Sequence, residues 1–165
     1  MSTDTDHAVA DFDAGTITRT IRIEAPIGTV WTALTSPEHI ATWWGHPSEF
    51  PDGWQAGSLG HFVWEDHTFP VRIDELDPPT AFALTWGDLD TTLEQSAAAT
   101  QVRFTLTAAG DTTTVTVLET GFDRLDAAAR RAAMDENTGG WNTVLDALRD
   151  YTAGRATPAD LQAVR

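Results

Sequence analysis

The feature that most constrains the fold is a run of segments, from residue 57 onward, in which apolar residues recur at every second position. The segments are GSLGHFVWE (57–65), TFPVRIDEL (68–76), FALTW (82–86), QVRFTLT (101–107) and TTVTVLE (113–119). A period of two is typical of strands with one buried face, and the AAGD between the last two segments indicates a hairpin. Together with ITRTIRIEA (17–25), the pattern predicts about six strands.

The first of these strands contains a charged residue on its apolar face. Ile17, Ile21 and Ile23 share that face, and Arg19 interrupts it. Charged side chains are rarely buried without a partner. We therefore expect Arg19 to lie near an end of the core or to pair with a carboxylate.

Other stretches carry a helical period. It predicts short helices in PIGTVWTAL (26–34), SPEHIATWWG (36–45) and LDAAARRAA (125–133), and a longer helix in GGWNTVLDALRDYTAG (139–154). The longer helix is clearly amphipathic, with one face formed by Trp141, Val144, Leu145, Leu148 and Tyr151. The polar stretch GDLDTTLEQSAAAT (87–100) predicts a long loop or frayed strand ends.

Trp43 and Trp44 stand side by side near the end of the second predicted helix. Adjacent residues on a helix point about 100° apart, so at most one of the two can face straight into the core. One interpretation is that both plug the end of the sheet. The other is that they form a lid over a ligand, because Gly45 and Pro47 follow directly and could act as a hinge.

Length and composition indicate one soluble domain. A chain of 165 residues suits a single domain with a substantial core. We expect that domain over 16–154, an acidic disordered tail over 1–15 and a flexible tail over 155–165. Neither a signal peptide nor an apolar run long enough to span a membrane is recognisable, which predicts a cytoplasmic location.

The charge is strongly negative, with 25 acidic residues against ten basic ones and a net charge of -15. Such a field repels phosphate backbones and anionic lipids, so we expect no nucleic-acid partner and no membrane insertion. The acidity suits a salt-rich cytoplasm, and biased codon usage explains it equally well. With no cysteine, disulfides and thiolate chemistry are excluded.

No catalytic or cofactor-binding motif is recognisable. The sequence contains no HExxH, GxSxG, Walker-type or GxGxxG pattern. The histidines that invite a metal hypothesis are His39, His46, His61 and His67, but their spacing offers no clear third ligand. We therefore predict no catalytic residue, no metal and no cofactor.

Two segments, APIGTVWTALTSPEHIATWWG (25–45) and GGWNTVLDALRDYTAG (139–154), resemble the hallmark stretches of domains related to the activator of the Hsp-ninety ATPase. These domains belong to the SRPBCC superfamily, which has the START-like, or birch-pollen-allergen-like, fold. The resemblance covers about 16–154. It implies an α+β helix-grip fold, in which a curved antiparallel sheet surrounds a long C-terminal helix and two short helices follow the first strand.

The resemblance also implies an apolar cavity between sheet and helix that receives lipids, polyketides or other hydrophobic molecules. Eukaryotic chaperone activators carry a separate N-terminal domain, and this chain has only a short acidic segment there, which argues against a chaperone partner. Periodicity leaves open whether the interior is packed or hollow, and the resemblance favours a modest cavity.

The candidate ligand-cavity residues are the large apolar side chains that periodicity directs between helix and sheet. They are Trp43, Trp44, Trp64, Phe82, Leu84, Trp86, Phe104, Val117, Trp141, Leu145 and Leu148. The candidate polar anchors for a ligand are Arg72, Arg103 and Glu119. Solvated charges on the outer face of the sheet are the alternative reading of these three residues.

Three functions fit these observations. The first is non-catalytic binding of a small hydrophobic molecule between the C-terminal helix and the sheet. The second is a cyclase- or aromatase-like enzyme using the same cavity, which requires a buried ionisable side chain. The third is an interaction module, either chaperone-associated or homodimeric, that uses an exposed aromatic patch.

Overall fold

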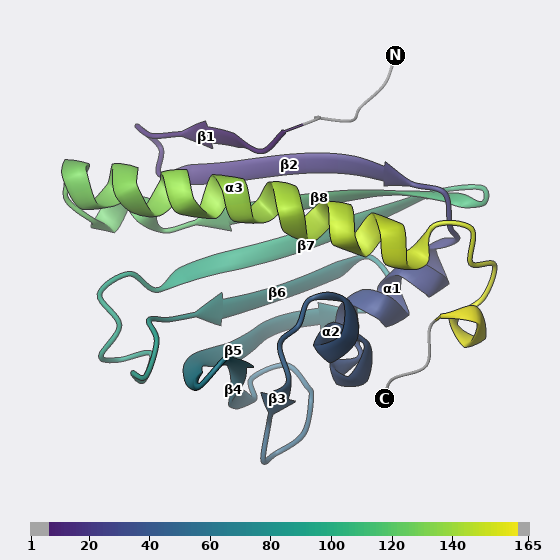
Figure 1. The fold of residues 1–165 in the computed structure, drawn as a ribbon, viewed down its shortest axis with the longest axis horizontal. Helices are drawn as coiled ribbons and strands as arrows, with labels where there is room; N and C mark the ends of the chain where they lie inside the picture. The colour runs from purple at the N-terminus through teal and green to yellow at the C-terminus, as the bar shows by residue number, and fades with distance from the viewer. Residues whose placement is uncertain (1–6, 162–165) are drawn as a thin grey trace.

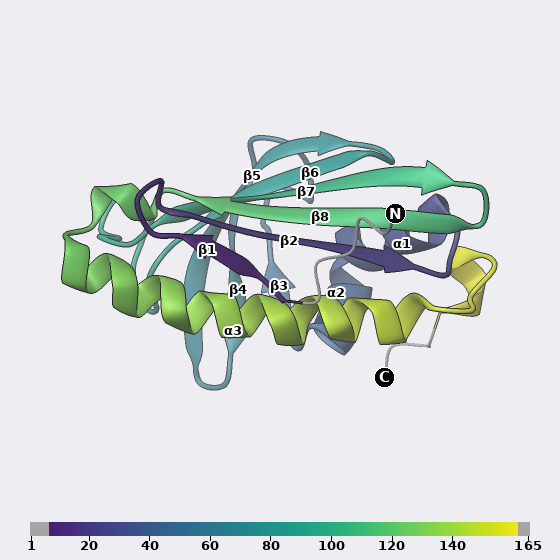
Figure 2. The same ribbon diagram turned by 90° about the horizontal axis from the view of Figure 1, so that it is seen from above.

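A computed structural model describes residues 7–161. Its single antiparallel sheet has eight strands in the order β1-β2-β8-β7-β6-β5-β4-β3 (Figures 1 and 2). The strands are β1 (Val9–Asp11), β2 (Thr16–Ile23), β3 (Ser48–Glu49), β4 (Leu59–Trp64), β5 (His67–Asp77), β6 (Ala81–Trp86), β7 (Thr100–Ala109) and β8 (Thr112–Thr120). The helices are α1 (Ile27–Thr35), α2 (Pro37–Trp43) and α3 (Ala127–Thr152), with short 3-10 turns at Phe122–Arg124 and Pro158–Asp160.

The arrangement confirms the predicted helix-grip fold. The long helix α3 lies along one face of the curved sheet. Helices α1 and α2 come after β2 in the chain and lie near the C-terminal end of α3 (Figure 1). Strand residues alternate between the face toward α3, which is buried, and the outer face, as in the buried–intermediate alternation along β8. This alternation produces one continuous core between helix and sheet.

The prediction of about six strands was too low. The two strands missed are β1, which pairs with β2 at Val9↔Thr18, and the two-residue β3, which pairs with β4 at Ser48↔Phe62. Both are too short to display a period of two. Consequently, β1 occupies part of the predicted acidic tail, whose residues 1–6 lie outside the described residues. At the other end, Leu161 is buried within the predicted flexible tail.

A single helix replaces the predicted pair of C-terminal helices. Asp126 caps its start, because its Oδ1 accepts a hydrogen bond from the Ala129 N–H at 2.9 Å. The helix then runs through Gly139 and Gly140 without a break. We had expected a turn at these glycines, since glycine disfavours helix interiors. Residues 87–99 lie in neither a helix nor a strand, in agreement with the predicted loop.

Arg19 is buried and paired, as expected. Its Nη2 lies 2.7 Å from Asp146 Oδ1 on α3, and its Nη1 donates to the carbonyl oxygen of Asn142 at 2.7 Å. These contacts hold β2 against the C-terminal half of α3. Among residues 7–161, no helix is both long and apolar enough to cross a membrane.

Replacement of Gly139 by alanine is expected to stabilise the protein. A Cβ built there meets no atom within 4 Å, and alanine is favoured over glycine in a helix interior by about 0.8–1 kcal/mol. Urea denaturation should therefore show a higher free energy of unfolding for Gly139→Ala.

The control for this prediction is Gly15→Ala. Gly15 has a φ of +70°, and a Cβ there would collide with the backbone of Asp123, so this variant should be less stable than the parent chain. A loss of stability in Gly139→Ala would contradict the prediction.

Candidate functional site

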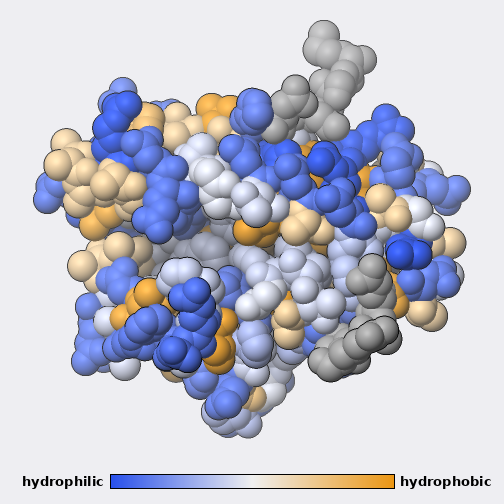
Figure 3. Space-filling model, viewed as in Figure 1, coloured by the Kyte–Doolittle hydropathy of each residue, from blue (hydrophilic) through white to orange (hydrophobic). Residues whose placement is uncertain are grey.

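A pocket of about 520 Å³ lies at the end of the helix–sheet space where α3 begins. We call it the open-end pocket. Figure 3 shows the surface hollowed in this region, below α3 and to the left of centre. The pocket is lined by His46, Trp64, Phe69, Trp86, Gly87, Asp88, Leu89, Ala98, Thr100, Phe122, Ala133, Glu136, Asn137 and Gly140.

The aromatic walls of this pocket come from segments far apart in the sequence. Phe69 on β5 packs edge-on against Trp86 at the end of β6, with ring centroids 5.9 Å apart. His46, just after α2, packs edge-on against Phe69 at 5.3 Å. The opposite wall is the face of α3 that contains Asn137 and Gly140. Because Gly140 has no side chain, the helix contributes open space there.

The two adjacent tryptophans occupy different environments. Their rings are stacked, with centroids 5.3 Å apart. Trp44 packs against core rings, among them Trp86 at 5.9 Å and Trp141 at 6.0 Å. Trp43 lies on the outer side of this stack, and its indole Nε1 donates to the Ala33 carbonyl of α1 at 2.7 Å. Thus Trp44 adjoins one wall of the open-end pocket, and Trp43 fixes α2 against α1.

Most of the predicted cavity residues pack the core instead of lining the pocket. Trp64 and Trp86 are the candidates that line it. The fully buried ones are Phe82, Leu84, Phe104, Val117, Leu145 and Leu148, and Trp141 is only 2% exposed. A side chain with no accessible surface has no water-sized void beside it, so this part of the helix–sheet space is filled.

Glu119, a predicted polar anchor, is completely buried on the face of β8 toward α3. Its Oε1 accepts a hydrogen bond from the Trp141 indole at 2.8 Å. Its Oε2 accepts one from Thr100 Oγ1 at 2.5 Å and one from the Trp86 indole at 3.1 Å. The Asn137 amide donates to both oxygens, at 3.2 and 3.1 Å. Every partner is a donor, which suits an ionised carboxylate.

Three of these four donors connect Glu119 to the open-end pocket. Trp86, Thr100 and Asn137 line the pocket and also hold the carboxylate. Glu119 itself lies behind them and has no accessible surface. The carboxylate therefore holds three pocket residues in place from behind the pocket wall. A molecule in the pocket would not touch the carboxylate.

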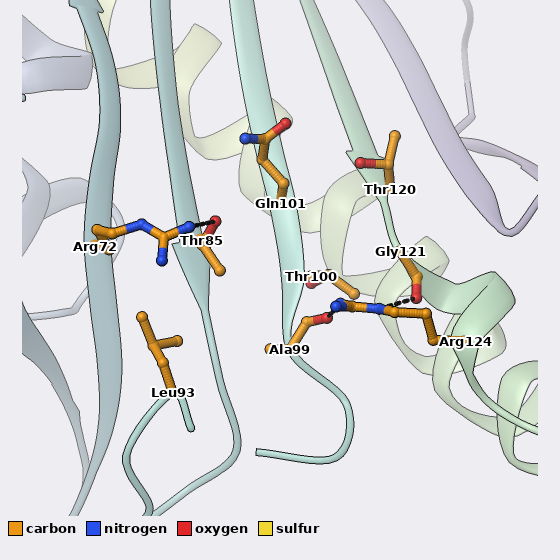
Figure 4. A pocket seen from close by; sticks show the side chains of 9 residues that line it. All are labelled: Arg72, Thr85, Leu93, Ala99, Thr100, Gln101, Thr120, Gly121 and Arg124. Carbon is orange, nitrogen blue, oxygen red and sulfur yellow. Dashed lines mark hydrogen bonds between the residues drawn. The ribbon is translucent and has the colours of Figure 1, made fainter. Parts of the chain in front are cut away.

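The other predicted anchors, Arg72 and Arg103, lie on the outer face of the sheet, away from α3. Arg72 donates from Nε to Asp74 at 2.7 Å, and Arg103 pairs with Glu75. Figure 4 shows Arg72 beside a shallow polar depression of about 420 Å³, with Arg124 at its other end. Neither Arg72 nor Arg103 reaches the helix–sheet space, in agreement with the outer-face reading.

His46 is the histidine that contributes to the pocket. It is hydrogen-bonded through Nδ1 to the Val63 carbonyl at 3.1 Å, and burial lowers the pKa of its imidazole. The imidazole is accordingly neutral at pH 7. His61 and His67 lie outside this pocket and face the carboxylates of Glu49 and Asp90. In residues 7–161, no three His, Asp or Glu side chains are grouped as metal ligands.

Sequence reasoning missed several residues of this site. Asn137 is not among the candidates that the sequence offers, yet it lies inside α3 and donates to Glu119. Phe69 lies on a segment recognised as a strand, and nothing in its spacing indicated a pocket. The signal that could have found Asn137 is its spacing from Trp141, because residues four apart lie on the same face of a helix.

Replacement of Glu119 by glutamine should destabilise the protein strongly. The amide would turn a donor toward a set of donors and leave buried polar groups unpaired, which costs about 2–4 kcal/mol. The measurement is urea denaturation, with Glu94→Gln on the exposed loop as the control. A loss as small as that of the control would contradict the role assigned to Glu119.

His46 should make folding stability depend on pH. Its pKa is lowered in the folded state from the ordinary value of 6.5, so its contribution is present above about pH 6.5 and is lost as the pH falls through the folded-state value. Between about pH 8 and about pH 5.5, the parent chain should lose more free energy of unfolding than His46→Gln. Equal losses in the two proteins would refute this assignment.

The chain is similar in structure to several proteins whose structures have been solved. Among solved structures, protein MLL2253 from Mesorhizobium loti has a TM-score of 0.68 at 22% identity, covering 82% of this chain and 94% of that one. The Aha1 dimer from Colwellia psychrerythraea has a TM-score of 0.65 at 18% sequence identity. The match covers 84% of this chain and 96% of that one. DynU16, from the dynemicin biosynthetic locus, has a TM-score of 0.66 at 21% sequence identity, and the match covers 83% of this chain.

The chain spans only 46% of the length of DynU16. At these identities the likenesses establish the fold and nothing further. None of the curated protein sequences matches the chain. The family model described as "Activator of Hsp90 ATPase homolog 1-like protein" matches residues 24–153, which include strands β3 to β8 and helices α1 to α3. The chain therefore belongs to the family of Activator of Hsp90 ATPase homolog 1-like proteins.

Proposed function

We propose that the protein binds a small, largely apolar, ring-bearing molecule in the open-end pocket and holds it without covalent chemistry. The observation that carries this proposal is a pocket of about 520 Å³ with aromatic walls, next to core side chains that have no accessible surface. Small-molecule sites typically measure about 300–1,000 Å³ and combine apolar walls with a few placed polar groups. The biological role would be sequestration or delivery in the cytoplasm.

The aromatic walls favour a ligand with a flat or compact apolar part. Trp86 and Phe69 offer ring faces and edges against which another ring can pack. Thr100 and Asn137 are neutral polar groups of the lining, and both hydrogen-bond to Glu119. A rigid, pre-formed wall lowers the entropic cost of binding.

An enzyme of the cyclase type is the second candidate, and Glu119 is the observation that favours it. This reading requires a buried ionisable side chain, and Glu119 is one. However, four side chains already donate to its oxygens, and it has no surface toward the pocket. Proton transfer by Glu119 would require Trp86 or Asn137 to move aside, so we favour binding without catalysis.

A homodimeric module is the third candidate. It draws on the Colwellia psychrerythraea relative, which is a dimer, and on large exposed apolar side chains such as Leu59 and Trp64. Trp64 is half exposed where it lines the open-end pocket, so ligand binding accounts for its exposure as well. Sizing chromatography over a range of concentrations separates the two accounts.

A paired substitution on α3 tests the binding proposal. Gly140→Leu should fill the pocket from the helix side, whereas Gly139→Leu places the same side chain outside it. We expect saturation-transfer NMR to detect binding of tert-butylbenzene to the parent chain and to Gly139→Leu. Gly140→Leu should weaken that binding by about tenfold or more, since it removes contact area worth at least 1.4 kcal/mol.

Urea denaturation of both variants serves as the control, because leucine is well tolerated in helices and both should stay folded. Equal binding to Gly139→Leu and Gly140→Leu would place the probe elsewhere. The absence of binding to the parent chain would contradict the proposed function.

A further inference from the structure

We infer that the open-end pocket prefers an apolar ligand that carries a positive charge, such as an aryl ammonium group. This inference rests on the proposed binding function and adds the charge of the ligand. Two features of the pocket carry it: the aromatic rings among its lining residues, and the sign of the charged side chains that line it.

The walls are of the kind that attracts cations. The face of an aromatic ring is negative, and a cation over a tryptophan face gains more than one over tyrosine or phenylalanine. Trp64 and Trp86 line the pocket together with Phe69. The fourth ring, His46, adds no opposing charge, since burial lowers its pKa and keeps the imidazole neutral.

The charges at the pocket are all negative. Glu136 lines it from α3, is exposed and takes part in none of the ion pairs of the described residues. Asp88 lines it from the opposite side, and its Oδ2 accepts hydrogen bonds from the backbone N–H groups of Ala97 and Ala98 at 3.0 and 3.4 Å. Behind the wall, Glu119 adds a carboxylate whose partners, all neutral, include Trp86.

The cationic side chain beside this region is Arg124, whose guanidinium donates to the Ala99 carbonyl and is not part of the pocket lining. Within residues 7–161, no arginine lines the pocket, and the chain contains no lysine. The net charge of -15 adds a long-range field that attracts cations and repels anions. An anionic ligand would therefore meet two rim carboxylates without a cationic partner, whereas a cation would meet carboxylates and ring faces together.

Three probes of similar shape and different charge test the inference on the full chain. They are phenyltrimethylammonium, tert-butylbenzene and benzenesulfonate, with dissociation constants measured by saturation-transfer NMR at low and high salt. We expect the cation to bind more tightly than the neutral probe by about threefold or more, and benzenesulfonate to bind most weakly. Added salt should narrow these differences.

A pair of neighbouring substitutions locates the charge effect. Glu136→Gln and Asp135→Asn each remove one negative charge from exposed positions on α3, but only Glu136 lines the pocket. Glu136→Gln should raise the dissociation constant of phenyltrimethylammonium by about threefold and leave that of tert-butylbenzene unchanged. Asp135→Asn should change neither appreciably.

The outcomes separate this inference from the function on which it rests. If tert-butylbenzene binds as tightly as the cation, the charge preference is wrong and the proposed binding function stands. If Asp135→Asn weakens binding of the cation as much as Glu136→Gln does, the effect comes from the overall surface charge and the inference is overturned. If no probe binds the parent chain, both the inference and the proposed function fail.

Discussion

The structure depends on one buried carboxylate. Glu119 is anchored on β8, and its hydrogen-bond partners come from β6, β7 and α3. Burial of a charge without partners would cost several kcal/mol, so the carboxylate, its four donors and the elements that carry them must assemble together. This requirement fixes the middle of α3 against the sheet, as the Arg19–Asp146 pair does further along the helix.

The shape of the interior follows from these two polar ties. Large apolar side chains such as Phe104 and Leu145 have no accessible surface, so the helix–sheet space is filled around them. Near Glu119, the lining residues of β5, β6 and the loop after β6 face α3 at Gly140, which contributes no side chain, and the open-end pocket lies there. Trp86 belongs to both regions, since it stacks on Trp141 at 5.7 Å and lines the pocket.

The sequence predicted the fold well because the fold is encoded in local periodicity. The central strands have a clean period of two, and Leu145 and Leu148 mark a helix face that needs a sheet to cover it. The short strands β1 and β3 were missed because two or three residues are too few to show a period. The full length of α3 was missed because paired glycines favour a break locally, and long-range packing overrides this preference.

The site was less predictable because it depends on tertiary distances. Sequence reasoning named Glu119 as a candidate polar anchor, with a solvated outer-face charge as the alternative. It could not show that Trp86, Thr100, Asn137 and Trp141 converge on this carboxylate. It also treated every inward apolar residue alike, although Phe82 fills the core and Trp86 reaches the pocket. The difference depends on where α3 starts relative to the strand ends, and no local pattern contains that information.

The most direct test of the binding account is the ¹H–¹⁵N spectrum of the tryptophan indole groups during titration with tert-butylbenzene. Trp64 and Trp86 line the open-end pocket, whereas the Trp43 indole is bonded to Ala33 on α1. The account predicts saturable shifts of the Trp64 and Trp86 indole signals, while the Trp43 signal stays in place. Shifts centred on Trp43, or no saturable shift of Trp86, would contradict it.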